Sequence, residues 1–137
     1  KDRNVFEILI NKSDKLLVEG NPLDISFLRE RVKEFFDNPL EKDDFPEKID
    51  KEIDYFGVIR VNKSAVVSLQ NDNGTSYGMY IKVQNEITAA VRELRDEISM
   101  QKFGRKYEEL QEEQQNAVKK IYPNAISEAE PKKIGGQ

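Results

Sequence analysis

The sequence predicts an α+β fold in which a small sheet carries its helices on one face. Short runs of β-branched and apolar residues, typical of strands, lie near both ends and in the middle of the chain. Between them, two segments repeat an apolar residue every three or four positions, the period of an amphipathic helix. The chain has 137 residues, 37% of them hydrophobic, and can bury one modest core. We therefore expect one domain over residues 1–131, with elements in the order ββαββααβ.

The opening of the chain predicts a hairpin followed by a helix. Two apolar runs flank residues 11–14, whose polar side chains suit a turn. A helix is expected from Asp24, where Asp24 or Ser26 would supply the cap, to the Asn38-Pro39 pair that stops it. Its apolar face would hold Ile25, Leu28, Val32 and Phe35 or Phe36.

The middle of the chain predicts an insertion and two strands. Residues 39–54 are charged, contain two prolines and follow neither period, so we expect an exposed insertion. Residues 56–61 and 65–70 are β-branched runs, and the second is the more apolar. It is therefore expected to be the more central strand.

The remainder predicts two helices and a strand. A long amphipathic helix, capped by Thr75 or Ser76, should end at Gly104. A second helix is expected over residues 107–121 and an edge strand over 125–130. Residues 132–137 are expected to form a mobile tail.

Composition removes several classes of function. The chain has neither His nor Cys, the residues that most often serve as bases and nucleophiles near neutral pH. It contains no nucleotide-binding or hydrolase motif, so we predict no enzyme, no catalytic residue, no metal site and no cofactor. The net charge of −4 argues against a nucleic-acid partner.

Three groups of residues have both a functional and a structural interpretation. Residues 71–75 invite two functional interpretations, a calcium loop or an anion-binding helix start, but they lack the full calcium-ligand pattern. A turn with an Asn-Gly left-handed position and a Thr75 or Ser76 cap explains the same residues and is the interpretation we favour. Neighbouring carboxylates, as in Asp43-Asp44, suit catalysis only inside a cleft and are expected at the surface. Four aromatic residues around the long helix suggest either core packing or a recognition patch: Tyr77, Tyr80, Phe103 and Tyr107.

Exposed strand edges are the preferred binding feature. Unpaired edge amides can take a strand from another chain, although a covering loop would also account for such an edge. The candidate edges are residues 5–10 and 125–130. The candidate contact residues are Val5, Ile8, Ile10, Ile126, Glu128 and Glu130.

The chain resembles the ExbD/TolR family of biopolymer transport proteins, in the form typical of Bacteroidetes. The resemblance is carried mainly by residues 66–98, VVSLQNDNGTSYGMYIKVQNEITAAVRELRDEI, and by the stretches at 103–123 and 125–136. The opening segments at 4–20 and 24–36 are similar to that family's periplasmic hairpin and first helix. The insertion and the third helix look like additions to the minimal family domain.

The resemblance implies a function for a longer parent protein. Family members place a small α+β domain on the periplasmic side of the bacterial inner membrane, after one transmembrane helix that bears an essential aspartate. The sequence begins at Lys1 rather than Met, so we expect it to be cut from such a parent, with its anchor outside this chain. Asp72 does not correspond to the membrane aspartate.

The same resemblance implies the partners. The parent protein would work with an ExbB-type channel protein and use the proton gradient to energise a TonB-type protein, and so transport across the outer membrane. This domain would be the coupling module and is expected to form a homodimer. The alternative is a TolR-like module that binds peptidoglycan and serves envelope integrity.

Overall fold

The computed structural model describes residues 2–128. Within them, seven strands, three α-helices and two short 3-10 helices follow one another along the chain. In order they are β1 (Val5–Ile10), β2 (Leu16–Val18), β3 (Asn21–Pro22), η1 (Ile25–Phe27), α1 (Leu28–Asp37), β4 (Lys48–Ile53), β5 (Gly57–Asn62), β6 (Val66–Asn71), α2 (Tyr77–Phe103), η2 (Tyr107–Glu109), α3 (Glu112–Ile121) and β7 (Ile126–Glu128).

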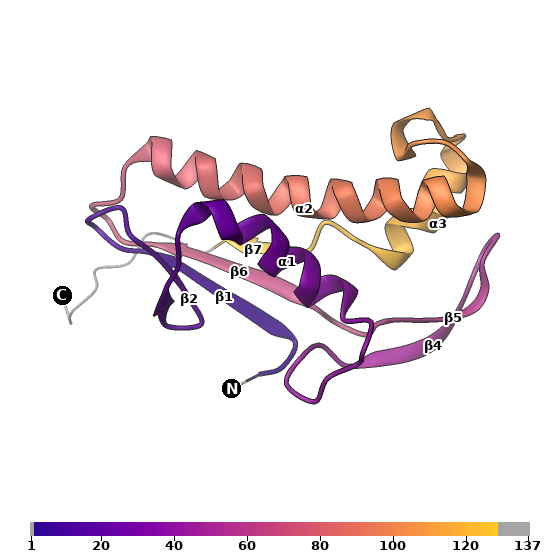
Figure 1. Cartoon of the computed structure of the whole chain (residues 1–137), viewed down its shortest axis with the longest axis horizontal. Coiled ribbons are helices and arrows are strands. Elements are labelled where there is room, and N and C mark those ends of the chain that lie inside the picture. Colours follow the sequence, from indigo (N-terminus) through magenta and orange to yellow (C-terminus); the bar gives the residue numbers. More distant parts are fainter. Residues whose placement is uncertain (1, 129–137) are drawn as a thin grey trace.

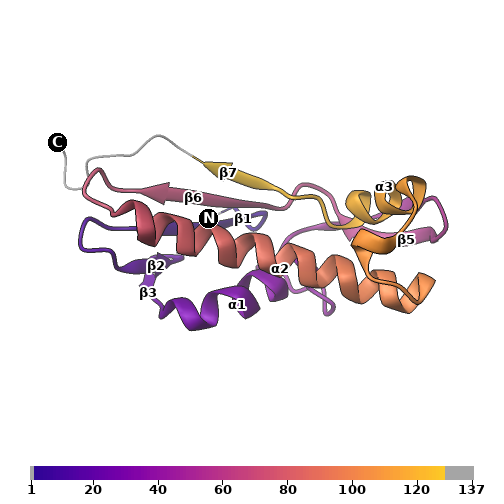
Figure 2. The ribbon, with the colours of Figure 1, turned by 90° about the horizontal axis from the view of Figure 1, so that it is seen from above.

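The main sheet has five strands in the order β3-β2-β1-β6-β7. β1 pairs antiparallel with β2 and parallel with β6, and β7 lies parallel to the far side of β6. Both α1 and α2 lie over the same face of this sheet (Figures 1 and 2). The α+β class with helices on one face of a sheet is confirmed.

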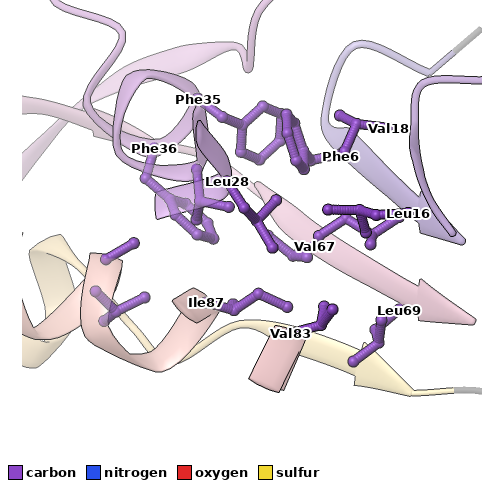
Figure 3. Packing of buried hydrophobic residues seen from close by; sticks show 14 of the residues in the cluster. Phe6, Leu16, Val18, Leu28, Phe35, Phe36, Val67, Leu69, Val83 and Ile87 are labelled. Carbon is purple, nitrogen blue, oxygen red and sulfur yellow. The ribbon is translucent and has the colours of Figure 1, made fainter. Parts of the chain in front are cut away.

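The principal core lies between that face and the two helices. Side chains alternate along the strands, so Phe6, Ile8 and Ile10 of β1 point to the helices and are at most 5% exposed. Figure 3 shows Phe6 of β1 beside Phe35 of α1. The centroids of these two rings are 5.2 Å apart. Truncating one such buried side chain to Ala would cost about 2–5 kcal/mol, so this core fixes the sheet and both helices.

A second, smaller core lies beyond the end of the main sheet. The β4–β5 hairpin packs there beneath α3 and the C-terminal part of α2 (Figure 1). Its buried members are Ile53, Val61, Ala117 and Ile121. Because α2 contacts both cores, it joins the two parts of the molecule.

The prediction of an exposed insertion over residues 39–54 is partly wrong. Residues 48–53 form β4, and Ile53 is only 1% exposed. The strand is hidden in the sequence because the exposed Lys51 stands at the alternate position between Ile49 and Ile53, where a regular strand would carry an apolar residue. Pairing with β5, in the separate two-stranded sheet, determines its structure instead.

The helix ends follow the local signals in the sequence. Ser76 caps α2 by accepting a hydrogen bond from the Met79 amide at 3.1 Å, and Gly104 ends α2 with a φ of 72°. Asn38 ends α1 in the left-handed region, with a φ of 35°. Asp24 supplies no cap to a backbone amide; its carboxylate instead accepts a hydrogen bond from the Ser26 hydroxyl.

Three further expectations differ from the structure or fall outside it. The helix expected over 107–121 is divided into η2 and α3, and the left-handed position expected at residues 73–74 is absent. The tail at 132–137 lies outside the described residues. Across residues 2–128, no helix combines the length and apolar character that crossing a membrane requires, although α2 has 27 residues.

Candidate partner-binding edge

The structure corrects one of the two predicted edges. β1 is the middle strand of the main sheet, hydrogen-bonded to β2 on one side and β6 on the other. Ile8 and Ile10 therefore present no open edge and are 1% and 0% exposed. Val5 is paired with Val66 of β6, and the pairing with β2 begins only at Ile8. The physical reason is the crossover through α1 and the β4–β5 hairpin, which returns the chain to the free side of β1 as the parallel strand β6.

The other predicted edge is present. β7 is an outer strand, paired with β6 alone among the described strands. Ile126 and Glu128 lie within it, whereas Glu130 lies outside the described residues. Figure 2 shows β7 running along the outside of β6 after the chain leaves α3.

The register decides which backbone groups of β7 face outward. The Val67 amide donates to the Ala125 carbonyl at 2.9 Å, and Val67 is aligned with Ile126. In a parallel ladder the backbone groups of alternate residues point to opposite sides. The N–H and C=O groups of Ser127 therefore face β6, whereas those of Ile126 and Glu128 face away from it. The Ile126 amide bonds locally to the Asn124 carbonyl at 3.3 Å, which leaves the Glu128 amide as the outward donor within the described part of the strand.

Side chains hold β7 against the body of the domain. Ile126 is half-buried and packs against the principal core. The Glu128 carboxylate accepts hydrogen bonds from the Tyr80 hydroxyl and from the Gln84 amide, the latter at 2.7 Å. Burial, followed by this contact with Glu128, raises the pKa of Tyr80 to about 12. The edge is thus fastened to the first half of α2.

The opposite edge of the sheet is a poor template. β3 contains only two residues, and Pro22 has no amide hydrogen to donate. Short strands and prolines are devices that prevent unwanted strand pairing. β7 is also short, with three described residues, but it contains no proline and keeps the outward amide of Glu128, so it is the better template of the two edges.

The remaining sequence candidates are not brought together into a site. The Asp43-Asp44, Glu108-Glu109 and Glu112-Glu113 pairs are all exposed, as expected of surface carboxylates. The four aromatic residues separate along α2: Tyr77 and Tyr80 lie at its start, while Phe103 and Tyr107 lie at its end. Phe103 packs edge-on against Tyr55 and Phe56, and Tyr77 is 79% exposed.

Residues 71–75 form a structural turn. The Asp72 amide donates to the Ile10 carbonyl at 2.9 Å, and the Thr75 hydroxyl contacts the same carbonyl at 3.0 Å. The Asp14 carboxylate accepts the Ser76 amide at 2.8 Å, which ties the β1–β2 turn to the start of α2 and lowers the pKa of Asp14. Among residues 2–128, no group of three or more His, Cys, Asp or Glu side chains is placed to hold a metal ion.

The sequence does not predict the hydrogen bonds from Tyr80 and Gln84 of α2 to Glu128 of β7. Glu128 lies 48 residues from Tyr80 and 44 from Gln84. A Glu in a short polar strand and a Gln on a polar helix face carry no local signal of pairing. Comparison of the chain with models of known protein families found no match, and comparison with curated proteins found none.

Proposed function

We propose that this chain is the periplasmic coupling domain of an ExbD/TolR-like inner-membrane transport protein, and that it engages its partner through β7. The observation that carries the proposal is an outer strand with outward backbone groups in a sheet whose other edge ends in Pro22. The sequence resemblance supplies the class of system: an ExbB-type channel protein and a TonB-type protein.

Strand addition at β7 suits a reversible coupling contact. The described edge is three residues long, so an incoming strand gains only a few main-chain hydrogen bonds from it. Each contributes about 0.5–1.5 kcal/mol net, which gives a weak contact unless side chains add to it. A domain that must bind and release a partner repeatedly is served by such an edge.

The hydrogen bonds of β7 connect a partner strand bound at this edge to the rest of the domain. Force on a strand added at β7 reaches α2 through Glu128, Tyr80 and Gln84, and β6 through the parallel ladder. The 27-residue helix α2 then spans both cores. The whole domain would therefore respond to the pull as one body.

The test is binding of the periplasmic segment of the TonB-type protein encoded in the same genome. Hydrogen exchange measured by NMR should show new protection of the Glu128 amide and of neighbouring β7 amides. Glu128→Pro removes the outward amide hydrogen and should abolish binding. Glu128→Ala is the matched control: it loses the same side chain, keeps the amide and should retain most of the affinity.

Two outcomes would contradict the proposal. Equal binding by the Glu128→Pro and Glu128→Ala variants would show that β7 is not the contact. Retention of the domain on isolated peptidoglycan sacculi, without binding of the TonB-type segment, would favour the TolR-like alternative. Sedimentation velocity across a concentration series tests the proposed homodimer, and a monomer at every concentration would count against it for this domain.

A further inference from the structure

A cavity of about 510 Å³ lies where α2, η2 and the segment before β7 meet. Small-molecule sites are commonly of this size. Three cationic side chains line it, Arg92 and Arg95 from α2 and Lys106 from the start of η2. The carboxylates of Asp96 and Glu108 also line it, so the cavity carries a net formal charge of about +1.

Arg95 is held in a fixed position at this cavity. Its Nε donates to the Tyr122 carbonyl at 2.8 Å, and its guanidinium carbon lies 5.2 Å from the centroid of the Tyr107 ring. The side chain is half-buried. With Nε occupied, the two terminal nitrogens form no hydrogen bond to any described residue, and together they make the fork that binds a carboxylate in two places.

Arg95 has no carboxylate partner, in contrast to the cations of the ion pairs between α1 and α2. Arg29 and Lys33 each lie within 4.0 Å of at least two carboxylates, as does the exposed Arg60. No described carboxylate comes that close to Arg95. The difference is visible in the direction of the pKa shifts: contacts with carboxylates raise the pKa of Arg29 and Lys33, whereas burial lowers the pKa of Arg95.

A half-buried charge without a counter-charge is unfavourable, because burial removes part of its hydration. Arginine stays protonated at neutral pH, so it cannot escape this cost by losing its proton. Burial also lowers the pKa of Lys48, but its ammonium group donates to the Asp37 carbonyl at 2.7 Å, whereas both terminal nitrogens of Arg95 lack an acceptor among the described residues. The arrangement leaves a place for an anion from outside the chain.

The rest of the lining narrows the class of anion. Asp96 and Glu108 would repel a doubly charged group such as phosphate, and the net charge matches a single carboxylate. Thr88 and Asn124 add a hydroxyl and an amide that suit the backbone of a peptide. The Tyr107 hydroxyl is buried and has no hydrogen-bond partner within the described chain, so one donor near this cavity also remains unused.

We propose that this cavity binds a short peptide or amino-acid derivative through a single carboxylate held by the terminal nitrogens of Arg95, with Arg92 and Lys106 adding charge. The site lies between α2, η2 and residue 124, apart from the outward edge of β7. It does not depend on the coupling function proposed above.

The experiment is an NMR titration of the folded chain with matched peptides at up to about 10 mM, a range that detects millimolar affinities. The first probe is acetyl-Ala-Ala with a free terminal carboxylate, and its control is the same peptide with an amidated terminus. A third probe, amidated acetyl-Ala-Glu-Ala, carries its carboxylate on a side chain. We expect the Arg95 Nε–H signal and the backbone signals around Asn124 to shift with a free carboxylate and to remain unchanged with the fully amidated control.

The two carboxylate probes distinguish the sources of the ligand. A stronger response to the free terminus identifies the end of a peptide chain as the ligand, and a stronger response to the Glu probe identifies an acidic side chain. Either result supports the site. Equal responses to acetyl-Ala-Ala and its amidated control would overturn it, as would tighter binding of inorganic phosphate than of either carboxylate.

Variants separate recognition from folding. Arg95→Gln should weaken carboxylate binding roughly tenfold or more, because a charge-assisted two-point contact is lost. Arg92→Gln should weaken carboxylate binding a few-fold. Because Arg92 is exposed, this variant should fold normally, and it can therefore test the proposal even if Arg95→Gln does not fold. Arg31→Gln, an exposed change on α1, is the matched control and should bind normally. Unchanged affinity in a folded Arg95→Gln or Arg92→Gln variant would refute the proposal.

Discussion

Buried polar side chains in this domain differ in whether their hydrogen-bonding groups have partners. Asn38 is 1% exposed, yet its amide nitrogen donates to the Pro46 carbonyl at 3.1 Å and its oxygen accepts the Lys42 amide at 3.0 Å. It therefore both ends α1 and anchors the following loop. Ser99 is 0% exposed and its hydroxyl has no partner among residues 2–128. A buried polar group without a partner reduces stability, so the two residues have opposite effects.

Replacing Ser99 with Ala should stabilise the protein. The change removes a buried hydroxyl that has no described partner, and Ala is also the better helix former. The expected gain in the free energy of unfolding is about 0.5–1.5 kcal/mol, measured by urea denaturation. Asn85→Ala, at an exposed site on the same helix, reports the helix-propensity part alone. A gain at Ser99 no larger than the gain at Asn85 would show that the hydroxyl is not costly where it is.

Residues whose roles depend on near neighbours could be predicted from the sequence, and the others could not. Ser76 and Gly104 act on backbone within four residues of themselves, so their types and positions identify them as caps. Arg95 instead depends on Tyr122, which is 27 residues away. In the sequence it stands among Glu, Asp and Arg residues of a polar helix face and looks like any solvated charge. Only the fold shows that Arg95 reaches the Tyr122 carbonyl and lies against the Tyr107 ring.

At the scale of elements, a glycine lies near each end of α2, and the two have different backbone conformations. Gly104 has a φ of 72°, in the left-handed region, and a Cβ built there would meet no atom within 4 Å. Gly78 lies in the first turn of the helix with helical backbone, and its surroundings are equally open. Any difference between substitutions at the two sites therefore comes from backbone conformation and not from a steric clash.

Ala substitutions at these two glycines should change stability in opposite directions. Gly104→Ala should lower the free energy of unfolding by about 1 kcal/mol, because a residue with a Cβ is strained in the left-handed region. Gly78→Ala should raise it by about 0.5 kcal/mol, because Ala favours the helical backbone. Thermal and urea denaturation of both variants provide the measurement. Stabilisation by Gly104→Ala would show that the helix continues past residue 104 in solution.

Strand identity was predictable where alternation was regular, but strand order was not. β1, β2 and β6 stand out because their apolar residues point consistently to the core. The sequence did not predict β4, because Lys51 interrupts the alternation of Ile49 and Ile53, or β3, because it is only two residues long. The mistaken edge at residues 5–10 has a different origin. Each strand looks the same in sequence whether it has one neighbour or two, and the parallel partner of β1 arrives about 60 residues later.

At the scale of the whole molecule, the two helices over the sheet are joined by an ionic network. Arg29 of α1 contacts Glu86 and Glu93 of α2 at 3.0 and 2.8 Å. Lys33 contacts Glu93 and Glu97 at 3.1 and 2.8 Å. Glu93 is therefore shared by two cations, and its side chain is 33% exposed. The network borders the principal core, so its charge state bears on the stability of the whole domain.

The network makes stability depend on pH in a direction that follows from Glu93. Burial raises the pKa of Glu93, but hydrogen bonds from Lys33 and Arg29 outweigh burial, and the pKa lies below its ordinary value of 4.5. The folded state thus binds this proton less readily than the unfolded state. Its contribution is complete above the unfolded pKa and is lost as pH falls through the folded pKa.

Glu93→Gln should therefore destabilise the protein by about 1 kcal/mol near neutral pH and by progressively less in acid, because the wild-type carboxylate is then protonated as well. The measurement is the free energy of unfolding of both proteins from about pH 7 down to about pH 3. Glu30→Gln is the matched control, since Glu30 is 71% exposed and meets Lys33 only at 4.0 Å; it should change stability little at any pH. A difference between wild type and Glu93→Gln that stays constant down to the lowest pH would mean that the Glu93 carboxylate owes its effect to packing and hydrogen bonding, and not to its charge.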